Sequence, residues 1–349
     1  MTKKIQILAI IAIVQVMLTV MIWFENGSIE GSTQQIHLLT FKPDEIDHII
    51  IKSREQSVDL TKKDNQWQLL DGFPANQSQV DSLLRKLAGL KYGLPVATSA
   101  NALERFKLSD NNFERQILLK KGNESVAHLF LGSGAGARLS HARNADQNSV
   151  FSVAMGSYDA PDDLDNWQDK SILQFEQDSV TAIELKDLLI SLTTNKETEG
   201  IIDPKAEQKA EKETVWVMAK LADNEQLDQD KINNSLLELS QLRFNKVIAT
   251  EKKAEFNLEN PELRFVLSFK EHPKRSYLLS KIKDSEDYVL KVSDRDEYFQ
   301  LASYTAKSIL EKVNEKAWLV KPAEIAQSNL DYPTDKKASD GETVSNQSK

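Results

Sequence analysis

Residues 132–137, which read GSGAGA, have the residue types of a loop that cradles phosphate. They fit G-x-G-x-x-A, a variant of the dinucleotide fingerprint, and they follow a predicted strand. That chemistry requires a helix directly after the loop, because amide groups at the helix N-terminus hold the pyrophosphate. Residues 138–141 have the pattern of another strand instead. We therefore predict a flexible hairpin turn over residues 132–136, and the chain has no G-x-x-x-x-G-K-[ST] loop for ATP hydrolysis.

Five closely spaced acids suggest calcium chemistry: Asp159, Asp162, Asp163, Asp165 and Asp169. Calcium loops of the D-x-[DN]-x-[DN]-G type need a glycine turn and a later Glu, which this spacing lacks. A helix predicted over residues 157–173 explains the acids better, because its positive dipole end attracts carboxylates. We predict no metal site here.

Two pairs of residues occupy matching places in an internal repeat: Trp67 with Trp216, and Arg115 with Arg264. The tryptophans suggest an aromatic binding surface, although a core position between strand and helix suits their large area better. The arginines suggest an anion site, and a solvated charge at a strand start is the simpler interpretation.

Histidines and serines form no recognisable catalytic arrangement. His48 and His128 fall within strand patterns, where we expect structural roles. No two of the five histidines have metal-ligand spacing, and no G-x-S-x-G elbow is present. We predict no catalytic, cofactor-binding or metal-binding residue, no cofactor, and a chain that is not an enzyme.

Composition narrows the function classes further. The net charge of −9 over 349 residues argues against a nucleic-acid partner. The absence of cysteine excludes disulfides and thiolate chemistry. A chain of this length can bury a core large enough to fold without disulfides.

Residues 5–24 form an uncharged, apolar run. A helix of that length spans about 30 Å, the hydrocarbon thickness of a bilayer. Lys3 and Lys4 precede the run and Glu25 follows it, which predicts a cytoplasmic N-terminus and a periplasmic body. We expect an uncleaved single-pass anchor in the inner membrane; a cleaved signal peptide is the alternative. The anchor residues are Ile5, Ile7, Leu8, Ile10, Ile11, Ile13, Val14, Val16, Met17, Leu18, Val20, Met21, Ile22, Trp23 and Phe24.

The elements that position these residues follow from periodicity. Apolar residues at i, i+3, i+4 and i+7 predict an amphipathic helix over residues 80–90, with Asn76 as its N-cap. A shorter helix is expected over residues 103–106. Alternating and β-branched runs predict strands over residues 46–51, 58–61, 67–70, 115–120, 126–131, 139–143 and 150–153.

The pattern then repeats. Residues 180–186 match residues 46–52, and residues 216–218 match residues 67–69. Residues 298–301 match residues 150–153, and residues 307–310 match residues 170–173. The helix residues Val80, Leu84, Leu87, Leu90 and Tyr92 match Ile232, Leu236, Leu239, Leu242 and Phe244. An ordered series of this kind predicts an internal duplication.

The fold class is therefore α+β: an N-terminal transmembrane helix followed by two duplicated modules of antiparallel sheet plus helices. We expect a cytoplasmic N-terminus (1–4), the anchor (5–24), a tether (25–40), two modules (41–175 and 176–313) and a polar, largely disordered tail (314–349). The second module carries a polar insert at residues 194–213, which we expect to be mobile because it has few apolar residues to bury.

The strand-strand-Trp opening, the helix over residues 75–92 and the segment Lys-Ser-Ile-Leu resemble the family catalogued as domain of unknown function 4340. The resemblance covers residues 41–312 in two copies. It implies a single-span envelope protein associated with an ABC transporter of the gliding-motility type, with its ATPase, permease and auxiliary subunit. It assigns no functional residue.

Three functions remain open at this point. The first is a non-enzymatic accessory or scaffold protein that binds subunits of an ABC-type transport system. The second is an envelope hydrolase with a dispersed site, and the third is a periplasmic binding or sensor module for an exported substrate. The lack of a nucleophile arrangement favours the first.

Overall fold

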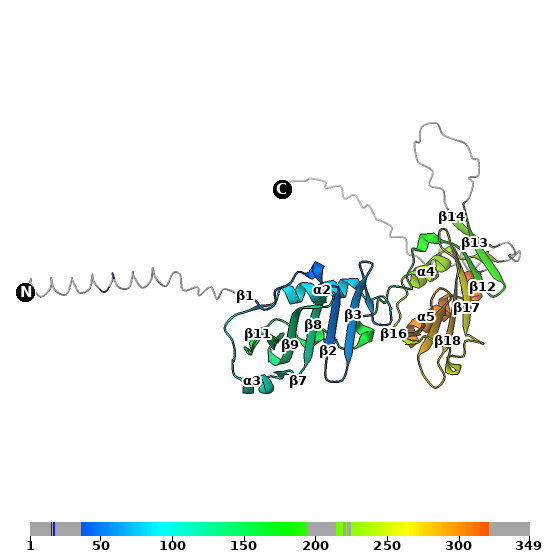
Figure 1. The fold of residues 1–349 in the computed structure, drawn as a ribbon. Helices are drawn as coiled ribbons and strands as arrows, with labels where there is room; N and C mark the ends of the chain where they lie inside the picture. The colour runs from blue at the N-terminus through cyan, green and yellow to red at the C-terminus, as the bar shows by residue number, and fades with distance from the viewer. Residues whose placement is uncertain are drawn as a thin grey trace, which may run out of the picture. The chain divides into compact units, whose positions relative to one another are not determined.

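The computed structural model describes Gln15, Met17 and residues 36–194, 214–218, 221 and 225–320. The chain divides into two compact units, Met1–Asp169 and Lys170–Lys349, whereas the sequence places the boundary at residues 175/176. Within the described residues each unit combines a large antiparallel sheet with a few helices, so the fold is α+β (Figure 1).

Seven antiparallel strands form the sheet of the first unit, in the order β11-β10-β9-β8-β2-β3-β4. Ile49 lies opposite Leu60 and Ile51 opposite Val58. All four side chains are buried, which specifies this register because a shift by one residue would expose them. The strands are β2 (His48–Lys52), β3 (Ser57–Lys63), β4 (Gln66–Leu69), β8 (Arg115–Lys121), β9 (Glu124–Gly136), β10 (Leu139–Asn144) and β11 (Phe151–Val153).

Helix α2 (Gln77–Ala88) supplies the helical part of this core. The Asn76 side chain accepts a hydrogen bond from the Gln79 amide, which confirms the predicted N-cap. The buried residues at helical spacing are Val80, Leu83, Leu84 and Leu87, as the periodicity predicts.

Smaller elements complete the first unit. Strand β1 (Ile36–His37) pairs with β5 (Lys91–Tyr92), and Leu38 and Leu39 are buried. The fold therefore begins within the predicted tether rather than at Phe41. The others are η1 (Pro43–Glu45), α3 (Ala100–Arg105), β6 (Leu108–Ser109) and β7 (Asn112–Phe113).

The helix predicted over residues 157–173 is wrong. The structure has two short 3-10 turns there, η2 (Ser157–Asp159) and η3 (Leu164–Asn166). The Asp163 side chain accepts from the Asp165 amide, and the Trp167 indole donates to the Pro161 carbonyl at 2.8 Å. These local hydrogen bonds use a backbone amide and a backbone carbonyl that would pair with other backbone groups in a helix. Pro161 also disfavours helical geometry in the residue before it.

Eight antiparallel strands form the sheet of the second unit, in the order β14-β13-β12-β17-β18-β19-β20-β16. Ile183 lies opposite Ile190 and Leu185 opposite Leu188, and all four are buried. The strands are β12 (Val180–Leu185), β13 (Leu188–Thr194), β14 (Thr214–Met218), β16 (Lys246–Ala249), β17 (Leu263–Phe269), β18 (Arg275–Lys281), β19 (Tyr288–Val292) and β20 (Tyr298–Leu301).

Three helices accompany this sheet: α4 (Gln229–Ser240), α5 (Ser303–Lys312) and α6 (Glu315–Trp318). Trp318 is buried, and β21 (Leu319–Val320) pairs with β15 (Gln226–Leu227). The predicted tail thus begins with ordered core residues, because its first apolar side chains have a place to pack. The remaining turns are η4 (Gln177–Ser179) and η5 (Ala254–Phe256).

The predicted insert lies between two paired strands. Strand β13 ends at Thr194, β14 begins at Thr214, and these two residues are cross-strand partners. Residues 195–213 and 321–349, on which the predictions of mobility and disorder fall, lie outside the described residues.

The transmembrane prediction is contradicted, and with it the predicted inner-membrane localisation and periplasmic body. In the described part of the chain, no helix is both long and apolar enough to cross a membrane. A span requires about 20 consecutive apolar residues. The longest described helices, α2 and α4, have 12 residues each and a polar face. Of the predicted anchor at residues 5–24, only Gln15 and Met17 are described, both helical.

Candidate functional site

The glycine-rich segment is part of a strand, not a flexible turn. Strand β9 continues through Gly136, and β10 follows, so no helix is present to hold a pyrophosphate. The Ser133 amide donates to the Phe106 carbonyl at 2.9 Å. A Cβ on Gly132 would lie 2.0 Å from that same carbonyl oxygen. Gly132 is therefore required for close backbone packing, a role that its motif does not reveal.

Basic side chains hold two of the clustered aspartates. Asp159 pairs with Lys86, and Asp162 pairs with Arg115, each at 2.6 Å. Arg115 also donates to the Ala160 carbonyl at 3.0 Å, which fastens this loop to β8. Among the residues that the structure describes, no three His, Asp or Glu side chains form a group that could bind a metal ion.

The two predicted arginine positions differ. Arg115 is half-buried and paired with Asp162, whereas Arg264 is exposed on β17. A shared anion site would require similar surroundings, so this pair supports none. The two histidines have structural partners: His48 contacts Asp59, and His128 contacts Gln116, each at 2.8 Å.

His128 lies on the first sheet beside Phe130, with ring centroids 4.7 Å apart. Partial burial lowers the pKa of His128, and the positive charge of Arg143 lowers it further. Arg143 is itself buried and donates to Asp110 at 2.6 Å and to the Leu108 carbonyl at 2.8 Å. These residues hold the β6–β7 segment against the sheet.

Both matched tryptophans are core residues, with exposed fractions of 2% for Trp67 and 5% for Trp216. The Trp67 amide donates to Gln77 Oε1 at 2.8 Å, and Gln77 Nε2 donates to the Trp67 carbonyl at 3.0 Å. Gln229 makes the same two bonds with Trp216, at 2.7 and 2.9 Å. The sequence reasoning missed these glutamines, although their spacing equals that of the matched helix residues.

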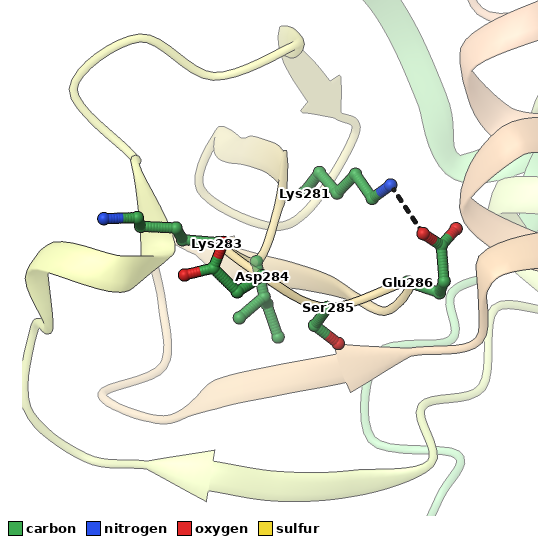
Figure 2. A pocket seen from close by; sticks show the side chains of 6 residues that line it. Lys281, Lys283, Asp284, Ser285 and Glu286 are labelled. Carbon is green, nitrogen blue, oxygen red and sulfur yellow. Dashed lines mark hydrogen bonds and ion pairs between the residues drawn. The ribbon is translucent and has the colours of Figure 1, made fainter.

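A shallow hollow of about 380 Å³ lies at the turn between β18 and β19. Figure 2 shows the Lys281 and Glu286 side chains, which both line it, directed toward each other, and their charged atoms are 3.2 Å apart. The Ser285 hydroxyl accepts from the Asp287 amide, and the Ser285 amide donates to the Ile282 carbonyl. These contacts stabilise a hairpin turn.

A larger groove of about 1020 Å³ lies on the second unit, and we call it the unit 2 groove. Its walls are residues 174–179, the C-terminal end of α4, the connection from β17 to β18, and Asp294. The Phe175 and Phe269 rings meet edge to face, with centroids 5.3 Å apart. The Phe175 amide donates to the Ser240 carbonyl at 3.2 Å, which fixes the first wall against α4.

Arg275 is one of the residues that line this groove. Its Nε donates to Asp294 at 2.9 Å, its Nη1 donates to the Leu173 carbonyl at 3.2 Å, and it lies 6.0 Å from the Phe269 ring centroid. Two groove serines donate to backbone carbonyls, Ser179 to Glu176 and Ser240 to Leu237. Neither hydroxyl is directed at His272, so the groove contains no assembled nucleophile and base.

The described residues form a two-unit α+β protein, and the second unit carries this groove. A family model described as Domain of unknown function (DUF4340) matches residues 67–261. The chain belongs to this family, and the matched region begins at Trp67. No curated protein and no solved structure matches the chain.

Proposed function

We propose that this chain is a non-enzymatic accessory or scaffold protein that acts by binding other polypeptides. The arrangement of the unit 2 groove carries this proposal. Its walls combine aromatic, aliphatic and charged side chains, while Ser179 and Ser240 are hydrogen-bonded to backbone carbonyls. An enzyme of the hydrolase type would need a nucleophile within hydrogen-bond reach of a base, and the Ser179 and Ser240 hydroxyls donate to backbone carbonyls instead, which supports a binding role.

We further propose that the two units are copies of one module. In each sheet the first three strands form consecutive antiparallel pairs, and the first strand also pairs with a later one, β8 in the first unit and β17 in the second. The remaining strands then follow in chain order in both sheets, apart from the added edge strand β16. Two unrelated folds would rarely share a seven-strand order together with one amphipathic helix after the third strand.

Hydrogen bonds at equivalent places support the duplication. The amide of the N-cap Asn76 donates to the Trp167 carbonyl at 2.8 Å, and the amide of the N-cap Asp228 donates to the Trp318 carbonyl at 2.9 Å. On this basis Trp167 matches Trp318. The predicted match of residues 170–173 with residues 307–310 is therefore out of register, because α5 precedes Trp318 with no counterpart before Trp167.

The partner that we propose is an ABC-type transport system, engaged through its ATPase, permease or auxiliary subunit. This part of the proposal rests on the family resemblance and on a body suited to contact rather than catalysis. We propose that the two modules provide the surfaces that contact these subunits.

Affinity purification of the tagged full-length chain from its native host, in mild detergent, tests this proposal. We expect an ABC-type ATPase and permease to co-purify above the level seen with a tagged, unrelated protein of similar charge. Purification of the chain without either subunit would contradict the transport assignment. Turnover of an ester, peptide or glycoside substrate by the pure chain would overturn the non-enzymatic role and favour the hydrolase alternative.

A further inference from the structure

We propose that the unit 2 groove binds an extended, basic polypeptide segment that carries apolar side chains. This inference rests on the proposed polypeptide-binding function and names its site and the chemistry of its partner. Three features of the groove carry the inference: an incompletely buried apolar floor, an excess of carboxylates along the rim, and the C-terminal end of a helix.

The floor is apolar and still open to solvent. Phe175 and Phe269 are half-buried, and Leu237 on α4 is 44% exposed beside them. An apolar side chain inserted between these residues would complete their burial, and removal of this apolar surface from water would favour binding. Aromatic and aliphatic clusters of this kind are the usual anchor points of polypeptide interfaces.

The rim carries more negative than positive charge. Glu176, Asp178 and Glu271 are exposed, and none of them has an ion-pair partner among the described residues. The fourth carboxylate, Asp294, is occupied by Arg275. With His272 counted as neutral, four carboxylates face two cations, Lys270 and Arg275. Positive charge on a partner would therefore be complementary to this surface.

Helix α4 adds to the same preference. Its last residues form one wall, so the negative end of the helix dipole lies at the groove. The Gln241 carbonyl already accepts from Gln174 and the Ser240 carbonyl from Phe175. The dipole and the rim carboxylates thus both favour a cation, from different elements of the fold.

The shape indicates an extended segment rather than a small molecule. A volume of about 1020 Å³ is at the upper end for small-molecule pockets, and the groove is open rather than enclosed. An extended chain alternates its side chains between two directions. Apolar residues can then face Phe269 and Leu237 while basic residues face the rim.

A fluorescently labelled peptide of alternating Lys and Leu is the probe, and its affinity for the full-length chain is measured by anisotropy at 150 mM salt. Alternating Lys–Ser and Glu–Leu peptides serve as comparison probes. We expect the Lys–Leu peptide to bind most tightly. Equal binding of the Lys–Ser peptide, or preferred binding of the Glu–Leu peptide, would overturn the inference.

Variants locate the site. The triple variant Glu176→Gln, Asp178→Asn, Glu271→Gln should weaken Lys–Leu binding about tenfold, and Leu237→Ser should weaken it to a similar extent. The matched controls are the triple variant Asp187→Asn, Glu251→Gln, Asp284→Asn and the single variant Leu189→Ser, which change exposed residues elsewhere on the second unit. We expect these controls to bind like the original chain.

Equal weakening by groove and control variants would show non-specific attraction and overturn the inference. All of these positions are exposed, so the variants should fold, and equal melting temperatures confirm this. If the transport subunits co-purify but the peptide does not bind in the groove, this inference fails and the proposed function stands. If the peptide binds there but no subunit co-purifies, the transport assignment fails instead.

Discussion

Gln229 satisfies both backbone hydrogen-bonding groups of Trp216. Its Oε1 accepts from the Trp216 amide at 2.7 Å, and its Nε2 donates to the Trp216 carbonyl at 2.9 Å. Trp216 lies in the middle of β14, an edge strand. Gln77 does the same for Trp67 in β4, the corresponding edge strand of the first unit. An unpaired edge attracts other strands, and each glutamine bonds to the backbone amide and carbonyl of the tryptophan in its edge strand.

Replacement of Gln77 or Gln229 by methionine tests whether these hydrogen bonds stabilise the edge strands. Either substitution keeps the side-chain length. Gln229→Met removes two side-chain hydrogen bonds. Gln77→Met removes three, because Gln77 Nε2 also donates to the Ala75 carbonyl at 2.7 Å. Each variant should lower the free energy of unfolding by about 1–3 kcal/mol. Chemical denaturation provides the measurement. Gln79→Met, on the same helix as Gln77 but without these bonds, is the control and should change stability little. Equal decreases in the free energy of unfolding for all three variants would mean that the glutamine–tryptophan hydrogen bonds make no particular contribution to stability.

The glycines of residues 132–137 should respond very differently to alanine. A Cβ on Gly132 would lie 2.0 Å from the Phe106 carbonyl oxygen and 2.6 Å from that of Lys107. A Cβ on Gly134 would meet nothing within 4 Å. Gly132→Ala should therefore destabilise the protein by about 3 kcal/mol or more, and Gly134→Ala by less than about 0.5 kcal/mol. Thermal unfolding of the two variants measures the difference, and similar melting temperatures would contradict the close approach at Gly132.

The tryptophans distinguish a core role from a surface role. Trp67→Ala and Trp216→Ala should each cost about 3–5 kcal/mol, the range for truncation of a large core side chain. Tyr304, which is 80% exposed, provides the control, since Tyr304→Ala should leave stability nearly unchanged. Denaturation curves of the three variants measure these differences in the free energy of unfolding. Unchanged stability of either Trp variant would show that the indole does not support the core.

Tyr277 should make the protein sensitive to alkali. Burial raises its pKa from 10.0 to about 12, although the positive charge of Arg275 acts in the opposite direction. The unfolded chain loses this proton near pH 10 while the folded chain retains it, so stability falls as pH rises from about 10 to 12. The loss attributable to this residue is about 2–3 kcal/mol.

Tyr277→Phe should remove that component. The Tyr277 hydroxyl is buried without a hydrogen-bond partner among the described residues, so its removal should be nearly neutral at pH 7. Unfolding free energies of both proteins at pH 7, 9 and 11 provide the comparison. Parallel losses in the two proteins at pH 11 would assign the alkaline sensitivity to other groups.

Much of the fold could be predicted because local patterns determine it. The residues Val80, Leu83, Leu84 and Leu87 recur at helical spacing, and Asn76 is a strong N-cap, so α2 was predictable with its start. The β2 strand was predictable in the same way, because alternate burial of Ile49 and Ile51 follows from a period of two. These elements need only neighbouring residues for their definition.

Other features depended on residues distant in the sequence, and only the tertiary structure decided them. The residues around Gly132 in the sequence do not indicate that the Phe106 backbone leaves no room for a side chain at this position. The segment at residues 157–173 resembles a helix start, yet Arg115 and Lys86 from other elements hold its acids in a loop. The apolar run at residues 5–24 predicted a membrane span, but no described helix can form one. The unit 2 groove likewise exists only because residues 174–179, α4 and β17 meet in space, which no sequence window contains.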